Sequence, residues 1–177
     1  MNICVFCSAY VTDPVYVEPA QELARLIAAG GHNLVWGGSY VGIMKVMADG
    51  VRQGGGKIYG VSLGAYRKFA HKSADEMVIA KDLGERKAAM LKKSDAILVL
   101  PGGIGTIDEL TDIIELRKQG LHDKPIVILN IGGFYDGLQM LLARMEAENF
   151  VPVKIDKLVV FAKDAHSAMA YIKHLDK

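Results

Sequence analysis

The residues best suited to chemistry lie in a glycine-rich segment at 100–110, with the sequence L-P-G-G-I-G-T-I-D-E-L. Gly102, Gly103 and Gly105 leave the backbone N–H groups unobstructed by side chains. A helix is expected to begin at about Thr106, a good N-cap residue, and its N-terminus carries a partial positive charge. Unobstructed N–H groups at a helix start bind phosphate, so the segment predicts a phosphate site.

Glu109, at the end of this segment, has two interpretations. Thr106 and Glu109 form the pattern T-x-x-E, typical of a capping box in which the glutamate returns to the N-cap N–H. A phosphate bound to the glycines would instead repel the carboxylate and turn it toward the adjoining part of the ligand, which in a nucleotide is the ribose. The spacing alone leaves both interpretations open.

A second glycine-containing loop, Gly37-Gly38-Ser39, follows a predicted strand and precedes a predicted helix. Its glycines and hydroxyl favour a second contribution to phosphate binding, and a tight turn without a ligand is the alternative. Neither loop has the dinucleotide pattern G-x-G-x-x-G, and the Walker pattern with G-K-[ST] is absent from the sequence.

Arg86 lies just after a predicted helix start, where Asp82 is the expected N-cap and Glu85 follows three residues later. Leu83 and Met90 are each about one turn from Arg86, so its helix face is partly apolar. A solvated arginine is the ordinary expectation, because long cationic side chains reach water from such positions. The functional alternative is an arginine directed into a cleft, toward an anion or a departing base.

The hydropathy pattern predicts the α/β elements that must position these residues. Short apolar runs alternate with amphipathic windows, which is typical of a parallel sheet covered on both faces. We expect a three-layer, Rossmann-like open parallel sheet of about seven strands, with residues 1–177 in one domain. The predicted strands are 2–6, 33–36, 57–63, 77–80, 95–100, 125–131 and 158–162. The predicted helices are 15–29, 42–53, 83–93, 106–119, 134–148 and 165–175.

In such sheets ligands bind at the carboxyl ends of the strands, where the strand order reverses. Each loop from a strand to a helix is therefore a candidate wall of the site. The informative loops are 7–10, 36–42, 80–87 and 101–106.

Composition limits the classes of partner and location. The chain has 177 residues, 51% of them hydrophobic, and a formal charge of +1. This balance argues against a nucleic acid or a membrane held by bulk electrostatics. The sequence has no run of ~20 apolar residues and no cationic leader at its start, so a cytoplasmic protein is expected.

The potential metal ligands show no suitable spacing. Cys4 and Cys7 are spaced as C-x-x-C, but Cys4 falls in a predicted strand and no second pair follows. We expect reduced, structural cysteines. The five histidines are expected on the surface or in loops, and no metal and no cofactor are expected.

The segment 101–109, P-G-G-I-G-T-I-D-E, matches the signature P-G-G-x-G-T-x-x-E of the LOG ("lonely guy") family, whose members were long labelled lysine decarboxylase-like. The resemblance extends over about residues 3–152. It includes I-C-V-F-C at 3–7, R-K at 86–87, G-L-H-D-K-P at 120–125 and N-I-G-G-F-Y-D at 130–136.

The resemblance implies a dimeric Rossmann-like protein that hydrolyses the N-glycosidic bond of AMP or an N6-prenylated AMP of the cytokinin type. The products would be the free base and ribose 5-phosphate. Arg86 and Glu109 match the family's catalytic pair. The residues that match its phosphate turn are Gly102, Gly103, Gly105 and Thr106.

These residue types suit that chemistry. Departure of the base leaves positive charge on the ribose, which a carboxylate such as Glu109 stabilises while it orients the attacking water. An arginine is a poor proton donor because the guanidinium group keeps its proton in proteins, so the expected role of Arg86 is to orient the substrate and balance charge.

The sequence departs from the family on the side expected to face the base. The segment 37–45 reads G-G-S-Y-V-G-I-M-K where the family has G-G-G-S-x-G-L-M-G, and 7–10 reads C-S-A-Y in place of C-G-S-S. Leu83 and Gly84 replace a methionine and a histidine. The sequence therefore supports the reaction class more strongly than a prenylated adenine. The residues expected to line the base and ribose are Ser8, Tyr40, Leu83 and Lys87.

Two other functions compete with the hydrolase. A non-catalytic binding protein, similar to molybdenum-cofactor carriers, would use the same glycine turns to hold a phosphorylated cofactor. The altered base side favours it, and the presence of both Arg86 and Glu109 counts against it. A lysine decarboxylase would need pyridoxal phosphate, and no residue indicates a Schiff-base lysine. The expected partners are a nucleoside 5′-monophosphate and a second copy of the chain.

Overall fold

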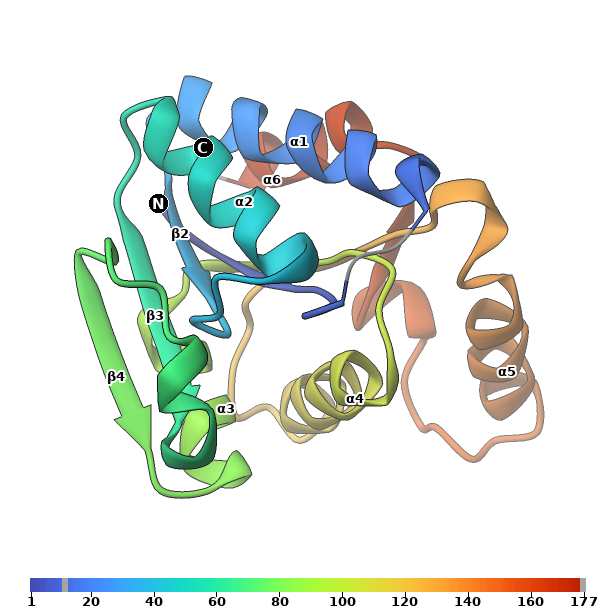
Figure 1. Ribbon diagram of the computed structural model, residues 1–177. Coiled ribbons are helices and arrows are strands. Elements are labelled where there is room, and N and C mark those ends of the chain that lie inside the picture. Colours follow the sequence, from blue (N-terminus) through green and yellow to red (C-terminus); the bar gives the residue numbers. More distant parts are fainter. Residues whose placement is uncertain (11–12, 176–177) are drawn as a thin grey trace.

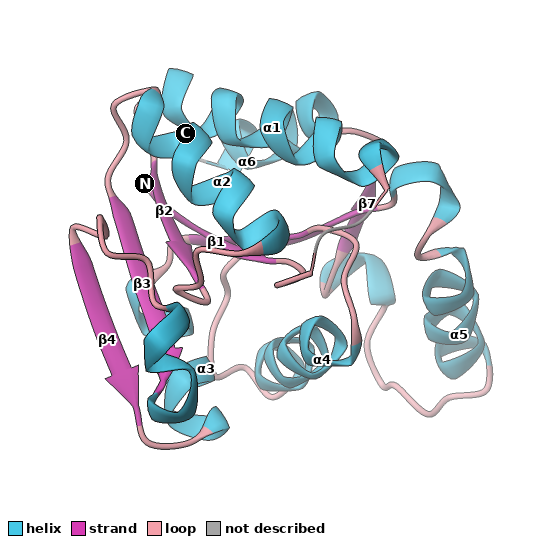
Figure 2. Cartoon of the chain, in the orientation of Figure 1, coloured by secondary structure: helices cyan, strands magenta, loops and turns pink. Residues whose placement is uncertain are grey.

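The computed structural model describes residues 1–10 and 13–175. They form a seven-stranded, all-parallel sheet in the order β4-β3-β2-β1-β5-β6-β7, with helices on both faces (Figures 1 and 2). The strands are β1 Asn2–Phe6, β2 Asn33–Trp36, β3 Ile58–Leu63, β4 Glu76–Ala80, β5 Ala96–Val99, β6 Ile126–Leu129 and β7 Val160–Ala162. The α-helices are α1 Pro14–Ala29, α2 Gly42–Gln53, α3 Leu83–Lys93, α4 Ile104–Lys118, α5 Asp136–Ala147 and α6 Ala165–Leu175.

The central strands are short and apolar because both of their faces are covered. All four residues of β5, A-I-L-V, and all four of β6, I-V-I-L, are buried. Alternate side chains of these strands pack into two separate cores, as the period of two in a strand requires. The predicted α/β class is therefore confirmed.

The two cores correspond to two helical layers. Helices α1, α2 and α6 lie on one face of the sheet, and α3 and α4 lie on the other (Figure 1). Leu23, Met47 and Trp36 belong to the first core, and Met90 and Leu110 to the second. The second layer is the one that carries Arg86 and Glu109.

The strand order reverses between β1 and β5. The chain runs outward from β1 to β4 and then returns to place β5 beside β1, with Phe6 opposite Val99. The loops that follow these two strands therefore leave the sheet side by side at its carboxyl edge. This is the position at which open parallel sheets bind ligands.

The start of α4 corrects one prediction. The helix begins at Ile104, and its N-cap is Gly103, with no side-chain hydrogen bond to the cap. Thr106 lies inside the helix, so the prediction that it caps the helix is wrong. The predicted strand at 125–131 also ends early, at Leu129, and a short 3₁₀ helix, Ile131–Gly133, follows it. Within the described ranges, no helix combines the length and hydropathy needed to cross a membrane.

Candidate active site

Arg86 and Glu109 form a buried ion pair between α3 and α4. Arg86 is 9% exposed and Glu109 is 5% exposed. Nη1 of Arg86 donates a hydrogen bond to Oε1 of Glu109, and Nε donates to the Val61 carbonyl oxygen at 3.0 Å. Both the solvated arginine and the capping-box glutamate are therefore wrong. The carbonyl of Val61 was not foreseen, because a backbone acceptor leaves no side-chain signal in the sequence.

The helical period explains how two charged residues come to be buried. On α4, Glu109 shares one face with Thr106, Leu110 and Ile113, all of them buried. On α3, Arg86 lies one turn before the buried Met90. Residues at these spacings share one face of a helix, and here that face packs on the sheet.

The start of α3 fixes the direction in which Arg86 points. Asp82 caps the helix as predicted, accepting a hydrogen bond from Glu85 N at 2.8 Å. The Glu85 carboxylate accepts from Lys81 N at 2.9 Å, one residue before the N-cap. Because the first turn is closed on both sides, Arg86 is held toward the carboxyl end of β3, where Val61 accepts its Nε.

Burial raises the pKa of Glu109 above the ordinary carboxyl value, and the neighbouring Arg86 guanidinium opposes this rise. The result is a carboxyl group that is more basic than one in water. Such a group is suited to hold or accept a proton from a water molecule during catalysis.

The segment 101–106 forms an open turn at the start of α4. A β-carbon placed on Gly103 or Gly105 would meet no atom within 4 Å. The first hydrogen bond of the helix runs from Ile107 N to Gly103 O at 3.1 Å, so the N–H groups of residues 104–106 precede the helical ladder. The first turn contains no acidic residue. The positive end of α4 is therefore available to an anion.

Gly102 and Thr106 contact each other within this turn. A β-carbon on Gly102 would lie 2.2 Å from Oγ1 of Thr106. Thr106 is 4% exposed. Its side chain therefore packs against the turn instead of capping the helix.

The other glycine loop is filled by the protein itself. A β-carbon on Gly37 would lie 2.2 Å from Nη2 of Arg86 and 2.7 Å from Cε of Met44. One on Gly38, whose φ is +78°, would lie 3.0 Å from Sδ of Met77. Both glycines are buried. Gly37 thus makes room for the Arg86 guanidinium, a role that the glycine pattern did not indicate.

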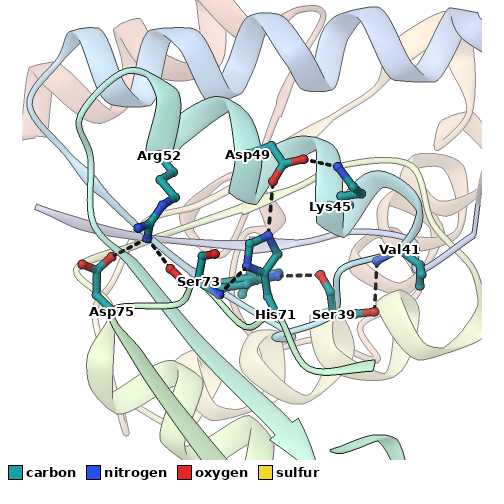
Figure 3. A network of polar contacts seen from close by, with 9 residues as sticks. Ser39, Val41, Lys45, Asp49, Arg52, His71, Ser73 and Asp75 are labelled. Atoms are coloured by element: carbon teal, nitrogen blue, oxygen red, sulfur yellow. Dashed lines mark hydrogen bonds and ion pairs between the residues drawn. The ribbon is translucent and has the colours of Figure 1, made fainter. Parts of the chain in front are cut away.

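A network of polar contacts with His71 and α2 also holds this loop (Figure 3). His71 N donates to the Gly38 carbonyl oxygen at 2.8 Å. The His71 ring contacts Asp49 on α2 through Nε2 and Oδ1, 3.2 Å apart. The Ser39 hydroxyl accepts from Val41 N at 3.4 Å, and Ser39 pairs with Ala70 in an isolated antiparallel bridge. Ser39 therefore shapes its own loop.

The four residues predicted to line the base and ribose fall into two groups. Ser8, after β1, accepts from Tyr10 N at 3.0 Å through its hydroxyl and from Met44 N at 3.1 Å through its carbonyl. Tyr40 is 40% exposed, and its ring centroid lies 6.2 Å from that of Phe69. These two residues lie beside the start of α2.

Leu83 and Lys87, the second group, lie on α3. Leu83 is 54% exposed at the first position of the helix. The Lys87 ammonium contacts carboxylate oxygens of Asp108 at 3.1 Å and Asp112 at 3.2 Å, and the lysine side chain is 13% exposed. Lys87 thereby ties α3 to α4 beside the Arg86–Glu109 pair, since Lys87 directly follows Arg86 and Asp108 directly precedes Glu109.

A cavity of about 920 Å³ adjoins this site at the ends of β3 and β4. Its walls are mostly apolar. The lining residues extend along the chain as far as Glu85 and do not include Arg86. The residues that line it are Leu63, Gly64, Ala65, Ile79, Ala80, Lys81, Asp82, Leu83, Gly84 and Glu85.

The cysteines and two of the histidines are largely buried within the fold. Cys4 and Cys7 are free and buried, and burial raises the pKa of Cys4 to about 12. His32 and His71 lie in loops, as predicted. Their side chains are largely covered, since His32 is 8% exposed and the ring of His71, in the network of Figure 3, is 10% exposed. Across residues 1–10 and 13–175, no group of three or more His, Cys, Asp or Glu residues is arranged to hold a metal ion.

A protein-family model described as "Possible lysine decarboxylase" matches residues 44–172. A cytokinin riboside 5′-monophosphate phosphoribohydrolase of Mycobacterium tuberculosis is 40% identical over 174 residues, which cover 96% of this chain and 93% of the relative. A probable enzyme of the same name from Oryza sativa subsp. japonica is 37% identical over 171 residues, covering 95% and 77%.

Solved structures of other proteins share the fold. The molybdenum cofactor binding protein of Rippkaea orientalis superposes with a TM-score of 0.76 at 21% identity, covering 99% of this chain and 97% of that one. The molybdenum cofactor carrier protein of Chlamydomonas reinhardtii gives 0.75 at 24% identity, covering 99% and 98%. At this identity the similarity establishes the fold alone.

Proposed function

The chain belongs to the family of cytokinin riboside 5′-monophosphate phosphoribohydrolases, the LOG family, and from that premise we propose that it hydrolyses the N-glycosidic bond of a nucleoside 5′-monophosphate. The substrate is AMP or an N6-modified AMP, and the products are the free base and ribose 5-phosphate. The observation that carries the proposal is the buried Arg86–Glu109 pair, whose glutamate lies on the same helix as the open glycine turn.

The glycine turn is the phosphate site in this proposal. The N–H groups of residues 104–106 and the positive end of α4 favour a doubly charged phosphate, and the open surroundings of Gly103 and Gly105 admit it. Glu109 follows Gly105 by four residues, which is a rise of about 6 Å along the helix. A ribose joined to that phosphate therefore reaches the carboxylate.

Glu109 is the catalytic carboxylate. As the bond to the base breaks, the ribose gains oxocarbenium character, and the nearby negative charge stabilises it. The same carboxylate orients the water that attacks the anomeric carbon. Its raised pKa makes it a better proton acceptor for that water than an exposed glutamate would be.

Arg86 orients this carboxylate and balances its charge in the apolar surroundings. Its Nε is held by the Val61 carbonyl, so the guanidinium has a fixed position from which Nη1 binds Glu109. An arginine stays protonated at any physiological pH, so it does not protonate the leaving base.

We propose that the protein consists of one domain and acts as a homodimer. Its proposed location is the cytoplasm, and no nucleic acid or membrane is proposed as a partner. Large apolar side chains beside the site support a second copy of the chain. Leu83, at the start of α3, is 54% exposed and Ile104, at the start of α4, is 87% exposed. Light scattering coupled to size-exclusion chromatography tests the dimer directly.

Incubation with AMP tests the reaction, with free adenine and ribose 5-phosphate followed by chromatography. Glu109→Gln should lower kcat by about 10²-fold or more, because the amide has a similar shape and lacks the charge. Glu148→Gln is the matched control, since it makes the same substitution at an exposed carboxylate at the end of α5. If the wild-type protein releases no base from any nucleoside 5′-monophosphate, it is a non-catalytic binding protein and the proposal is wrong.

A further inference from the structure

The motif N-I-G-G-F-Y-D at 130–136, which lies outside the site described above, forms the turn between β6 and α5. Its tyrosine, Tyr135, is 2% exposed. The Tyr135 hydroxyl donates a hydrogen bond to the Leu100 carbonyl oxygen at 2.8 Å. Leu100 directly precedes the glycine turn, so two loops on neighbouring strands are joined by one side-chain oxygen.

This hydrogen bond lies at the point where the backbone hydrogen bonds between β1 and β5 end and the glycine turn begins. Leu100 N still donates to Phe6 O on β1, at 3.0 Å. The next residue, Pro101, has no N–H and cannot continue the ladder. The Tyr135 hydroxyl therefore binds the last backbone carbonyl before Pro101 and the glycine turn.

Tyr135 is itself firmly held. Its backbone N–H donates to Oδ1 of Asn130 at 2.7 Å, and Nδ2 of Asn130 donates to Oδ1 of Asp136 at 2.7 Å. The ring packs edge-on against Phe134, with centroids 4.9 Å apart. Gly133, with a φ of +75°, permits the tight turn that brings these groups together. Burial raises the pKa of the Tyr135 hydroxyl, so it remains a donor at physiological pH.

We propose that Tyr135 is a positioning residue for phosphate binding, and that its hydroxyl holds the turn at 101–106 in the shape that accepts the phosphate. This inference rests on the proposed function for the identity of the ligand. A turn that is ordered before the ligand arrives binds it more tightly, because less conformational entropy is lost on binding.

Tyr135→Phe tests this, because it removes only the hydroxyl and keeps the packed ring. We expect the Kd of ribose 5-phosphate, measured by calorimetry, to rise about tenfold, which is the loss of one buried hydrogen bond's contribution. The KM for AMP should rise by a similar factor, while kcat stays within about threefold. Amide hydrogen exchange in residues 102–104 should become faster. Tyr59→Phe, on β3 at the amino edge of the sheet, is the matched control and should change none of these quantities.

The outcomes separate this inference from the proposed function. If the wild type binds ribose 5-phosphate but releases no base from AMP, the proposed function fails, and the ratio of the two Kd values still tests Tyr135. Equal Kd values and equal exchange rates in wild type and Tyr135→Phe overturn the inference. It is also overturned if kcat falls as much as KM rises, or if the wild type does not bind ribose 5-phosphate.

Discussion

The two glycine loops look alike in sequence and differ in what surrounds them. At 101–106, two of the glycines face open space, and the helix start that follows carries no acidic residue. At 37–39, a β-carbon on Gly37 would lie 2.2 Å from the Arg86 guanidinium, and Gly38 is packed against Met77. One loop leaves its backbone available to a ligand. The other uses the missing side chain to admit the Arg86 guanidinium.

This comparison shows two uses of glycine that a local pattern does not separate. A glycine exposes N–H groups when nothing packs over it, and it makes space when a neighbour does. In the proposed function both loops serve the same site: 101–106 binds the phosphate, and Gly37 leaves room for the arginine beside the carboxylate. Substituting each loop in turn should therefore damage different steps of the reaction.

Among substitutions in and around the two loops, the largest effect is expected from Gly37→Ala. The added methyl group must displace both Nη2 of Arg86 and Cε of Met44, because it would overlap the two atoms. We expect kcat for AMP to fall by about 10²-fold, with little change in KM, since the arginine no longer orients Glu109. Overpacking should also lower the free energy of unfolding by about 1–3 kcal/mol.

Gly50→Ala is the control for this loss of stability. A β-carbon there would lie 2.7 Å from the Cβ of Ala24, far from Arg86, in the contact between α1 and α2. It should destabilise the fold to a similar degree and leave kcat within about threefold. A Gly37→Ala variant that raises KM and spares kcat would mean that both loops bind phosphate, which contradicts the comparison.

The same substitution should change the pH dependence of the reaction. Burial raises the pKa of Glu109 and Arg86 opposes the rise, so displacement of Arg86 should raise that pKa further. The ionised carboxylate is the active form, and kcat therefore falls as pH decreases through the pKa. In Gly37→Ala this acidic limb should lie at higher pH than in the wild type, and Glu109→Gln should lack it. Stability has the opposite sign: a carboxyl with a raised pKa favours the fold when protonated, and this contribution is lost as pH rises through the raised pKa.

A pH-rate profile for the wild type, Gly37→Ala and Glu109→Gln measures this. An acidic limb at the same pH in the wild type and in Gly37→Ala would show that Arg86 does not act on the carboxyl from the position that Gly37 provides.

Gly103→Ala should have a smaller and different effect. Its φ of −89° and ψ of −161° are available to alanine, and the added methyl group meets no protein atom within 4 Å. The free energy of unfolding should fall by only about 1 kcal/mol, because Gly103 is the N-cap of α4 and alanine caps a helix less well than glycine. The methyl group enters the open space that the proposed phosphate would occupy, so the KM for AMP should rise about tenfold with kcat nearly unchanged.

Gly137→Ala on α5 is the matched control, because a β-carbon there also meets nothing within 4 Å. It should bind and hydrolyse AMP as the wild type does. Unchanged KM in Gly103→Ala would remove the open turn from the phosphate site and leave the 37–39 loop as the alternative.

The pattern of apolar runs predicted every strand and helix of the sheet to within a few residues, because buried parallel strands are continuously apolar. The start of α4 was missed because glycine also serves as an N-cap, so the helix needed no hydroxyl and began two residues before Thr106. The same pattern predicted that both glycine loops lie at the carboxyl edge of the sheet. It could not predict which loop is covered by side chains, because those side chains come from other parts of the chain.

The Arg86–Glu109 contact shows where local reasoning ends. The two residues are 23 positions apart, and each had an ordinary local interpretation, one as a solvated cation and one as a cap. Their pairing depends on α3 and α4 packing on the same face of the sheet, with Val61 and Gly37 shaping the space between them. Only the resemblance to a family joined them in advance. Tyr135 had no such indication, because its partner is a backbone carbonyl.

The smallest effect is expected from His71→Ala, which tests how the covered loop is held. The His71 ring contacts Asp49 and lies edge-on to Trp36, with centroids 6.0 Å apart, while its backbone N–H supports Gly38 and is kept in the variant. Loss of the ring should lower the free energy of unfolding by about 1 kcal/mol, the contribution of one partly buried polar contact. Because Arg86 is fixed separately by Val61, kcat should fall by no more than about threefold. Chemical denaturation and steady-state kinetics measure the two quantities. A loss of kcat as large as that of Gly37→Ala would mean that the loop depends on His71 for its shape, and that the arginine depends on the loop more than on its own hydrogen bonds.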